Sequence, residues 1–112
     1  MKHLEDSLQT TVADFLRAQY PKLLWFCCPN GGKRNAREAG RLKRMGVLPG
    51  VADLLLFWPG GMGAIELKVA KNKQTPAQLA FQDKWETLEG YYAVSRSLEE
   101  VIAVLHVWGV PK

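Results

Sequence analysis

The chain has 112 residues, of which 47% are hydrophobic and 23% charged, and its formal net charge is +4 at pH 7. These values exclude a disordered or low-complexity chain and are typical of one globular domain spanning residues 1–112. No apolar run reaches the roughly 18 residues of a membrane helix, and the polar N-terminus does not resemble a signal peptide. We therefore expect a cytoplasmic protein that does not contact a membrane.

The predicted elements begin with a helix at 4–19, where apolar residues recur at helical spacing and Pro21 follows the end. The apolar run 23–28 predicts a short buried strand that contains both cysteines of the chain. Two adjacent cysteines and two distant histidines provide no spacing for a zinc site. After a glycine-containing loop, Asn35 is a suitable cap for a second helix to about residue 45, closed by Gly46.

Two apolar runs, 51–58 and 64–69, predict a pair of strands joined by the glycine-rich turn 59–63. A third helix begins after Thr75 and runs to about residue 89. Its start is well marked, because Gln78 completes a capping box with Thr75 and proline occupies the first helical position.

A short strand at 91–94 precedes the last helix, which is capped by Ser97 and runs to about residue 108. The order is therefore α-β-α-β-β-α-β-α. This order predicts an α/β (α+β) fold in which helices flank a mixed central sheet.

Basic residues are concentrated between residues 33 and 44, where the one acid is Glu38. They are Lys33, Arg34, Arg37, Arg41, Lys43 and Arg44. Such a patch suits a nucleic acid, because neutralising phosphates releases condensed counterions. A solvated helix face explains the same residues, so the patch alone does not decide between these interpretations.

Asp53 and Glu66 are the only acids between residues 39 and 82, and both lie in runs that otherwise resemble buried strands. A buried carboxylate is costly unless its charge is compensated, and a metal ion is one such partner. If the strands pair as a hairpin about the Pro59–Gly60 bond, Asp53 lies directly opposite Glu66 on one face. A divalent cation such as Mg²⁺ would relieve their repulsion.

Lys68 follows Glu66 by two residues and is expected on the same face of the sheet. There it can orient an attacking water or stabilise charge on a phosphate. The alternative is structural: Asp53 would cap the start of its strand, and Glu66 and Lys68 would pair on a solvated face. The position of all three on one face, near a basic patch, favours a catalytic site.

The segment GVADLLL at 50–56, followed by Glu66-Leu67-Lys68, resembles the PD-(D/E)xK nuclease signature. The surrounding chain resembles the virus-type replication-repair nuclease (VRR-Nuc) family within that superfamily. Further similar positions are Glu5 with Gln9, the loop from Pro29 to Arg34, Gly46, Gly50, and Thr75-Pro76-Ala77-Gln78. The family usually has proline where this chain has Ala52, which weakens the motif but not the mechanism, because proline carries no catalytic group.

The resemblance implies a restriction-endonuclease-like core and a Mg²⁺- or Mn²⁺-dependent endonuclease that hydrolyses phosphodiester bonds of DNA. Asp53 and Glu66 would bind the ion, the main-chain carbonyl of Leu67 would complete the ligand set, and Lys68 would position or activate the water. The sequence does not distinguish Mg²⁺ from Mn²⁺, since both accept the same oxygen ligands.

Two further residues match catalytic positions of the family. Glu5 matches an acid that reaches the site from the first helix, and an acid that suits the helix dipole in the first turn explains it equally well. Gln78 matches a glutamine near the metal, and the capping box explains it without any chemistry.

Small single-domain members of the family resemble phage-encoded homodimers that act on branched DNA such as Holliday junctions. The last helix offers one support for a homodimer. We expect one apolar stripe to face the core: Leu98, Val101, Ile102, Leu105 and Trp108. This leaves Val104 and Val107 for another surface.

Two rival interpretations remain open. A non-catalytic DNA-binding module could keep the nuclease fold, but the intact Asp53, Glu66 and Lys68 argue against it. A small basic protein-interaction domain explains the charge but not the buried acids.

Overall fold

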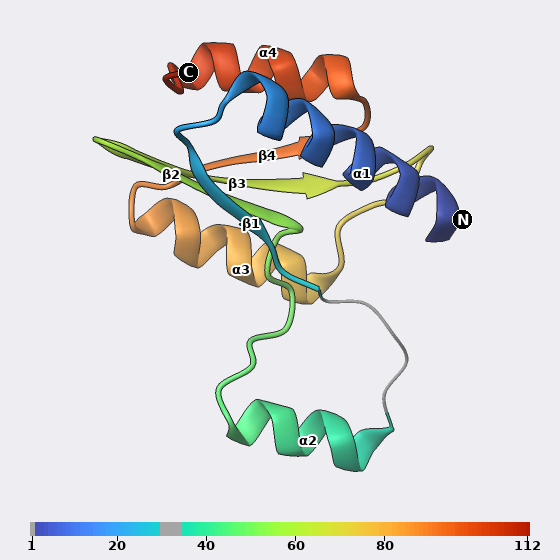
Figure 1. The fold of residues 1–112 in the computed structure, drawn as a ribbon. Coiled ribbons are helices and arrows are strands. Elements are labelled where there is room, and N and C mark those ends of the chain that lie inside the picture. The colour runs from blue at the N-terminus through green and yellow to red at the C-terminus, as the bar shows by residue number, and fades with distance from the viewer. Residues whose placement is uncertain (1, 30–34) are drawn as a thin grey trace.

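The structure is a computed structural model that describes residues 2–29 and 35–112. Its elements follow the predicted order (Figure 1). They are α1 (Lys2–Gln19), β1 (Leu24–Cys27), α2 (Ala36–Arg44), β2 (Leu54–Trp58), β3 (Gly61–Leu67), α3 (Pro76–Thr87), β4 (Tyr91–Ser95) and α4 (Leu98–Trp108). Among the described residues, no helix combines the length and apolar character needed to cross a membrane.

The strands form a four-stranded sheet in the order β1-β2-β3-β4. β1 and β3 both run antiparallel to β2, whereas β4 runs parallel to β3. The parallel pair requires a crossover connection, and α3 provides it. The sheet is therefore mixed, as the order of elements predicted.

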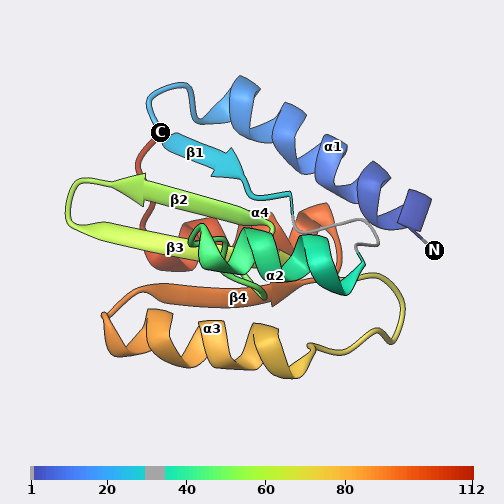
Figure 2. The same ribbon diagram turned by 90° about the horizontal axis from the view of Figure 1, so that it is seen from below.

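Helices cover both faces of this sheet (Figures 1 and 2). α1 and α4 lie on one face and α3 on the other. The larger core lies under α1 and α4, and its fully buried residues include Val12, Leu16, Leu54, Leu56, Ile65, Val101 and Leu105. On the opposite face Trp85 of α3 packs with Ala52 and Ala64. Because strand residues alternate between faces, even-numbered positions of β3 face α3.

The β2–β3 hairpin has the predicted register. Leu54 pairs with Ile65, and the pairing continues to Trp58 and Gly61 around the Pro59-Gly60 turn. β2 begins at Leu54, three residues later than the apolar run 51–58 indicated, so Asp53 immediately precedes the strand. The same register continued by one residue brings Asp53 opposite Glu66.

The prediction of a buried first strand is wrong. β1 is an edge strand, and Leu24 and Phe26 are 63% and 44% exposed. An apolar run looks the same in a central strand and at an uncovered edge, which explains the error. Cys27 and Cys28 carry free thiols.

The apolar stripe of α4 also differs from the prediction. Val101 and Leu105 are buried, but Ile102 is 39% exposed, and Val104 is half-buried instead. Successive residues of a helix are rotated by about 100° around its axis. Val101 lies at the centre of the apolar stripe, so Ile102 lies at its edge. Val107 is 80% exposed, as expected for a residue outside the core.

α2 stands apart from the sheet, on the side that α3 covers (Figure 1). Its N-terminus is capped as predicted, because the Asn35 side chain accepts a hydrogen bond of 2.7 Å from Glu38 N. Gly46 follows its end with a positive φ of 98°. α2 has no buried residue, so packing does not fix its position.

Candidate metal and nucleic-acid site

Asp53 and Glu66 are brought together at the end of the hairpin that is opposite its turn. The chain bends at Asp53 as it enters β2, and Asp53 Oδ2 accepts a hydrogen bond of 2.7 Å from Leu67 N. The Asp53 carbonyl accepts another from Cys28 N, at 2.9 Å. Asp53 is thus fixed between the two strands that neighbour β2.

Glu66 is 3% exposed and faces α3. Its Oε2 accepts a hydrogen bond of 2.9 Å from the side-chain amide of Gln78. Its Oε1 is buried and accepts no hydrogen bond from the described residues. A buried carboxylate oxygen without a donor is costly, and a nearby cation would compensate its charge.

The two carboxyl groups titrate as a pair. Burial, together with the negative charge of Asp53, raises the pKa of Glu66 to about 8, although Lys68 acts against the rise. Burial also raises the pKa of Asp53, against the opposing effect of the Leu67 N–H. Without a cation, the pair therefore favours a state with one bound proton.

Lys68 directly follows β3 and is 8% exposed. Its Nζ lies 3.6 Å from Glu66 Oε2, and its backbone N donates to Ser95 O at 3.1 Å. The structural alternative predicted this ion pair on a solvated face, but both side chains are buried. One lysine faces two carboxyl groups, so it balances one negative charge and leaves the second uncompensated whenever both groups are ionised.

Leu67 contributes backbone groups to the same place. Its N–H points to Asp53, and in an antiparallel strand the carbonyl of a residue points to the same neighbouring strand as its N–H. Two carboxylates and one carbonyl are hard oxygen donors that suit Mg²⁺, which commonly binds one or two carboxylates and retains waters or phosphates. These residues therefore fit a divalent cation.

Glu5 lies at the margin of this site and not within it. Its charge contributes to the raised pKa of Asp53, and its Oε2 accepts a hydrogen bond of 3.3 Å from the Asn72 side chain. Within residues 2–29 and 35–112, no three side chains of His, Cys, Asp or Glu come close enough together to hold a metal. The acid from α1 thus does not join the pair as a third ligand.

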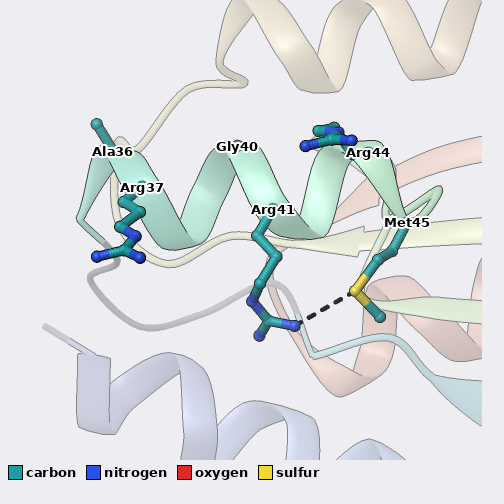
Figure 3. A pocket seen from close by; sticks show the side chains of 6 residues that line it. All are labelled: Ala36, Arg37, Gly40, Arg41, Arg44 and Met45. Atoms are coloured by element: carbon teal, nitrogen blue, oxygen red, sulfur yellow. Dashed lines mark hydrogen bonds between the residues drawn. The ribbon is translucent and has the colours of Figure 1, made fainter.

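The predicted phosphate contacts that the structure describes lie on α2, and Lys33 and Arg34 fall outside the described residues. Arg37, Arg41 and Arg44 line an open cavity of about 760 Å³ beside the helix (Figure 3). Arg41 donates to Met45 Sδ at 3.3 Å, and Lys43 is exposed. None of the four forms an ion pair with a described residue, so their charge is available to an anion.

The sequence did not indicate several polar residues around the site. Gln74 donates to the Tyr92 hydroxyl at 3.1 Å, and burial together with Glu66 raises the pKa of Tyr92 to about 12. Arg96 binds the backbone of the loop after Lys68. No local motif marks these residues, because their partners lie 18 to 26 positions away.

A mixed sheet with helices on both faces, and with carboxylates and a lysine at the end of one hairpin, is the arrangement that the sequence resemblance led us to expect of a nuclease-type domain. A solved structure described as a "VRR_NUC domain protein" is similar to this chain, with a TM-score of 0.76 and 25% sequence identity. The similarity covers 94% of this chain and 87% of the other. The chain therefore shares the fold of this VRR_NUC domain protein, in agreement with the resemblance that its sequence indicated. No family model matches the sequence, and no curated protein matches it.

Proposed function

We propose that this chain is a metal-dependent DNA endonuclease. The observation that carries the proposal is the buried Glu66 Oε1, which accepts no hydrogen bond from the described residues and belongs to a carboxyl group paired with Asp53. A DNA-binding module without activity has no use for two repelling buried acids, so this pair favours catalysis over the non-catalytic alternative.

Asp53, Glu66 and the Leu67 carbonyl would hold Mg²⁺ or Mn²⁺. A bound divalent ion supplies Lewis acidity toward the phosphate and lowers the pKa of a water. Gln78 holds Glu66 Oε2 and so leaves Oε1 for the ion. Lys68 contributes a positive charge 3.6 Å from Glu66, where it can hold a water and stabilise charge on the phosphate. Glu5 adds negative charge beside Asp53.

The DNA backbone would contact α2, whose arginines stand off the sheet on the α3 side. Branched DNA, such as a Holliday junction, and action as a homodimer are the finer parts of the proposal. They are supported by the family resemblance and by the exposed apolar Val107 of α4.

The decisive experiment compares Asp53→Asn and Glu66→Gln with the wild type on labelled four-way junction, flap and single-stranded DNA. We expect Mg²⁺- or Mn²⁺-dependent cleavage by the wild type and none by either amide variant, because a charged ligand is lost. Asp83→Asn, which changes an exposed acid on α3, is the matched control and should cleave normally. Full cleavage by both amide variants would falsify the proposed site.

A further inference from the structure

The loop at 70–73, which leaves the site just after Lys68, is a second basic surface. Lys71 and Lys73 are exposed. Neither forms an ion pair with any residue in 2–29 or 35–112. The loop itself contains no acid, so both ammonium groups are available to an anion.

Arg96, between β4 and α4, fixes the backbone of this loop. Its guanidinium donates to Ala70 O at 2.9 Å and to Asn72 O at 2.8 Å. Ala70 has a positive φ of 50°, a conformation that is unfavourable for a residue with a side chain and needs support from its surroundings. Both acceptors are neutral carbonyls, so Arg96 keeps its positive charge and adds it to that of the lysines.

Arg96 is itself anchored from α4. Its backbone N donates to Glu100 Oε1 at 2.6 Å, in the first turn of the helix. The loop is also tied to α1, because the Asn72 side chain donates to Glu5. Lys71 and Lys73 therefore project from a backbone that is held from two helices.

The location of the loop follows from the hairpin. Because β2 and β3 are antiparallel, the chain enters β2 at Asp53 and leaves β3 at Lys68 at the same end of the sheet. The linker from α2 leads to Asp53, and the loop at 70–73 follows Lys68. In Figure 1 α2 stands below the sheet, and the yellow loop leaves the end of β3 beside α1. The acid pair thus has a basic segment on each margin.

We propose that the loop at 70–73, held in place by Arg96, binds the phosphate backbone of DNA on the opposite margin of the acid pair from α2. This inference rests on the proposed nuclease function. Lysine ammonium groups contact phosphates as point charges, which sets the position and direction of a strand without reading its sequence. Two separated contacts hold a strand across the acid pair, whereas α2 alone would let it pivot.

The test measures binding of fluorescein-labelled duplex DNA by anisotropy in EDTA across a series of salt concentrations, so that no cleavage intervenes. For the double variant Lys71→Ala/Lys73→Ala we expect weaker binding and a log–log salt slope that is shallower by about one unit for each lysine. The charge-matched control is Lys22→Ala/Lys84→Ala. Lys22 precedes β1 at the hairpin-turn end of the sheet, and Lys84 lies in the last turn of α3. The control should keep the wild-type slope.

Arg96→Lys distinguishes the positioning of the loop from the positive charge at residue 96. Lysine keeps the charge but cannot reproduce the planar pair of hydrogen bonds to both carbonyls. We expect its affinity to fall toward that of the double lysine variant, with faster amide exchange at 70–73. If Arg96→Lys binds DNA with wild-type affinity, Arg96 is not needed to position the loop at 70–73.

If the double lysine variant and the charge-matched control share one slope, the loop is not a phosphate contact. The proposed function would still stand if Asp53→Asn abolishes cleavage. A wild type that binds no DNA at low salt would instead overturn both the inference and the proposed function.

Discussion

Gln78 joins the N-terminus of α3 to Glu66 through a single side chain. Its amide nitrogen donates to Glu66 Oε2 at 2.9 Å, while its amide oxygen accepts from Thr75 N at 2.9 Å. The two interpretations of this residue, as helix cap and as part of the site, are therefore compatible. The cap directs the amide nitrogen toward Glu66.

Gln78→Ala and Thr75→Ala should separate these two roles. Each removes half of the capping box and should lower the free energy of unfolding by about 1 kcal/mol. Only Gln78→Ala releases Glu66, so it should reduce the cleavage rate much more than Thr75→Ala does. Denaturant unfolding and single-turnover cleavage measure both effects. Equal cleavage rates in the two variants would limit Gln78 to capping.

The pH dependence of stability should reveal the coupled acids. In the metal-free protein the pKa of Glu66 is raised from 4.5 to about 8. Between these values the folded state holds a proton that the unfolded state has released. The free energy of unfolding should therefore fall as pH rises across this interval, by up to about 1.4 kcal/mol per pH unit, and the decline should stop above it.

Glu66→Gln cannot release this proton and should lack that decline. We expect it to match the wild type near pH 5 and to exceed it in stability at pH 8 in EDTA. Glu99→Gln, which changes an exposed acid of α4, should keep the wild-type profile. Urea unfolding from pH 5 to 9 provides the measurement. Parallel profiles for the wild type and Glu66→Gln would show that Glu66 is not held protonated.

Gly50 should tolerate no side chain. It has a positive φ of 81°, and a Cβ there would overlap the Ala77 carbonyl at the start of α3. Gly46 has a similar φ of 98° but open space around it. Both changes to alanine share the cost of the left-handed backbone, about 1–2 kcal/mol, and Gly50→Ala adds the steric overlap. We expect Gly50→Ala to lower the melting temperature clearly more, and equal losses would contradict the close packing.

The exposed face of α4 should decide whether two copies associate. Ile102, Ala103, His106 and Val107 are all exposed there, which gives one side of the helix an apolar surface. A two-fold interface uses the same patch twice, so Val107→Glu should shift a dimer toward monomer in light scattering. Glu99→Gln on the same helix is the control. A wild type that is monomeric at high concentration would remove the homodimer from the proposal.

Local signals in the sequence predicted the framework of the site well. The Pro59-Gly60 turn fixed the pairing of β2 with β3, and hence the opposition of Asp53 and Glu66. The caps at Asn35, Thr75 and Ser97 were recognisable because capping depends on residues three positions apart.

Contacts between distant segments could not be predicted in this way. Arg96 reaches Ala70 across 26 positions, and Asn72 reaches Glu5 across 67. Periodicity reports which face of an element is apolar, but not whether another element covers it. For this reason the exposure of Phe26 and Ile102 was missed.

The separation of α2 from the sheet has a consequence for how such a protein can change. β1 and β2 are neighbours in the sheet. The hydrogen bond from Cys28 N to Asp53 O joins the residue after β1 to the residue before β2. In the topology of the sheet, the part of the chain that contains α2 is the connection between the two antiparallel strands β1 and β2. Its last part is fixed, because Ala52 is fully buried and Gly50 packs on α3. The helix itself is not fixed by packing, so it is a replaceable module. If α2 contacts DNA as proposed, exchanging it would change substrate preference while the acid pair and the core stay unchanged.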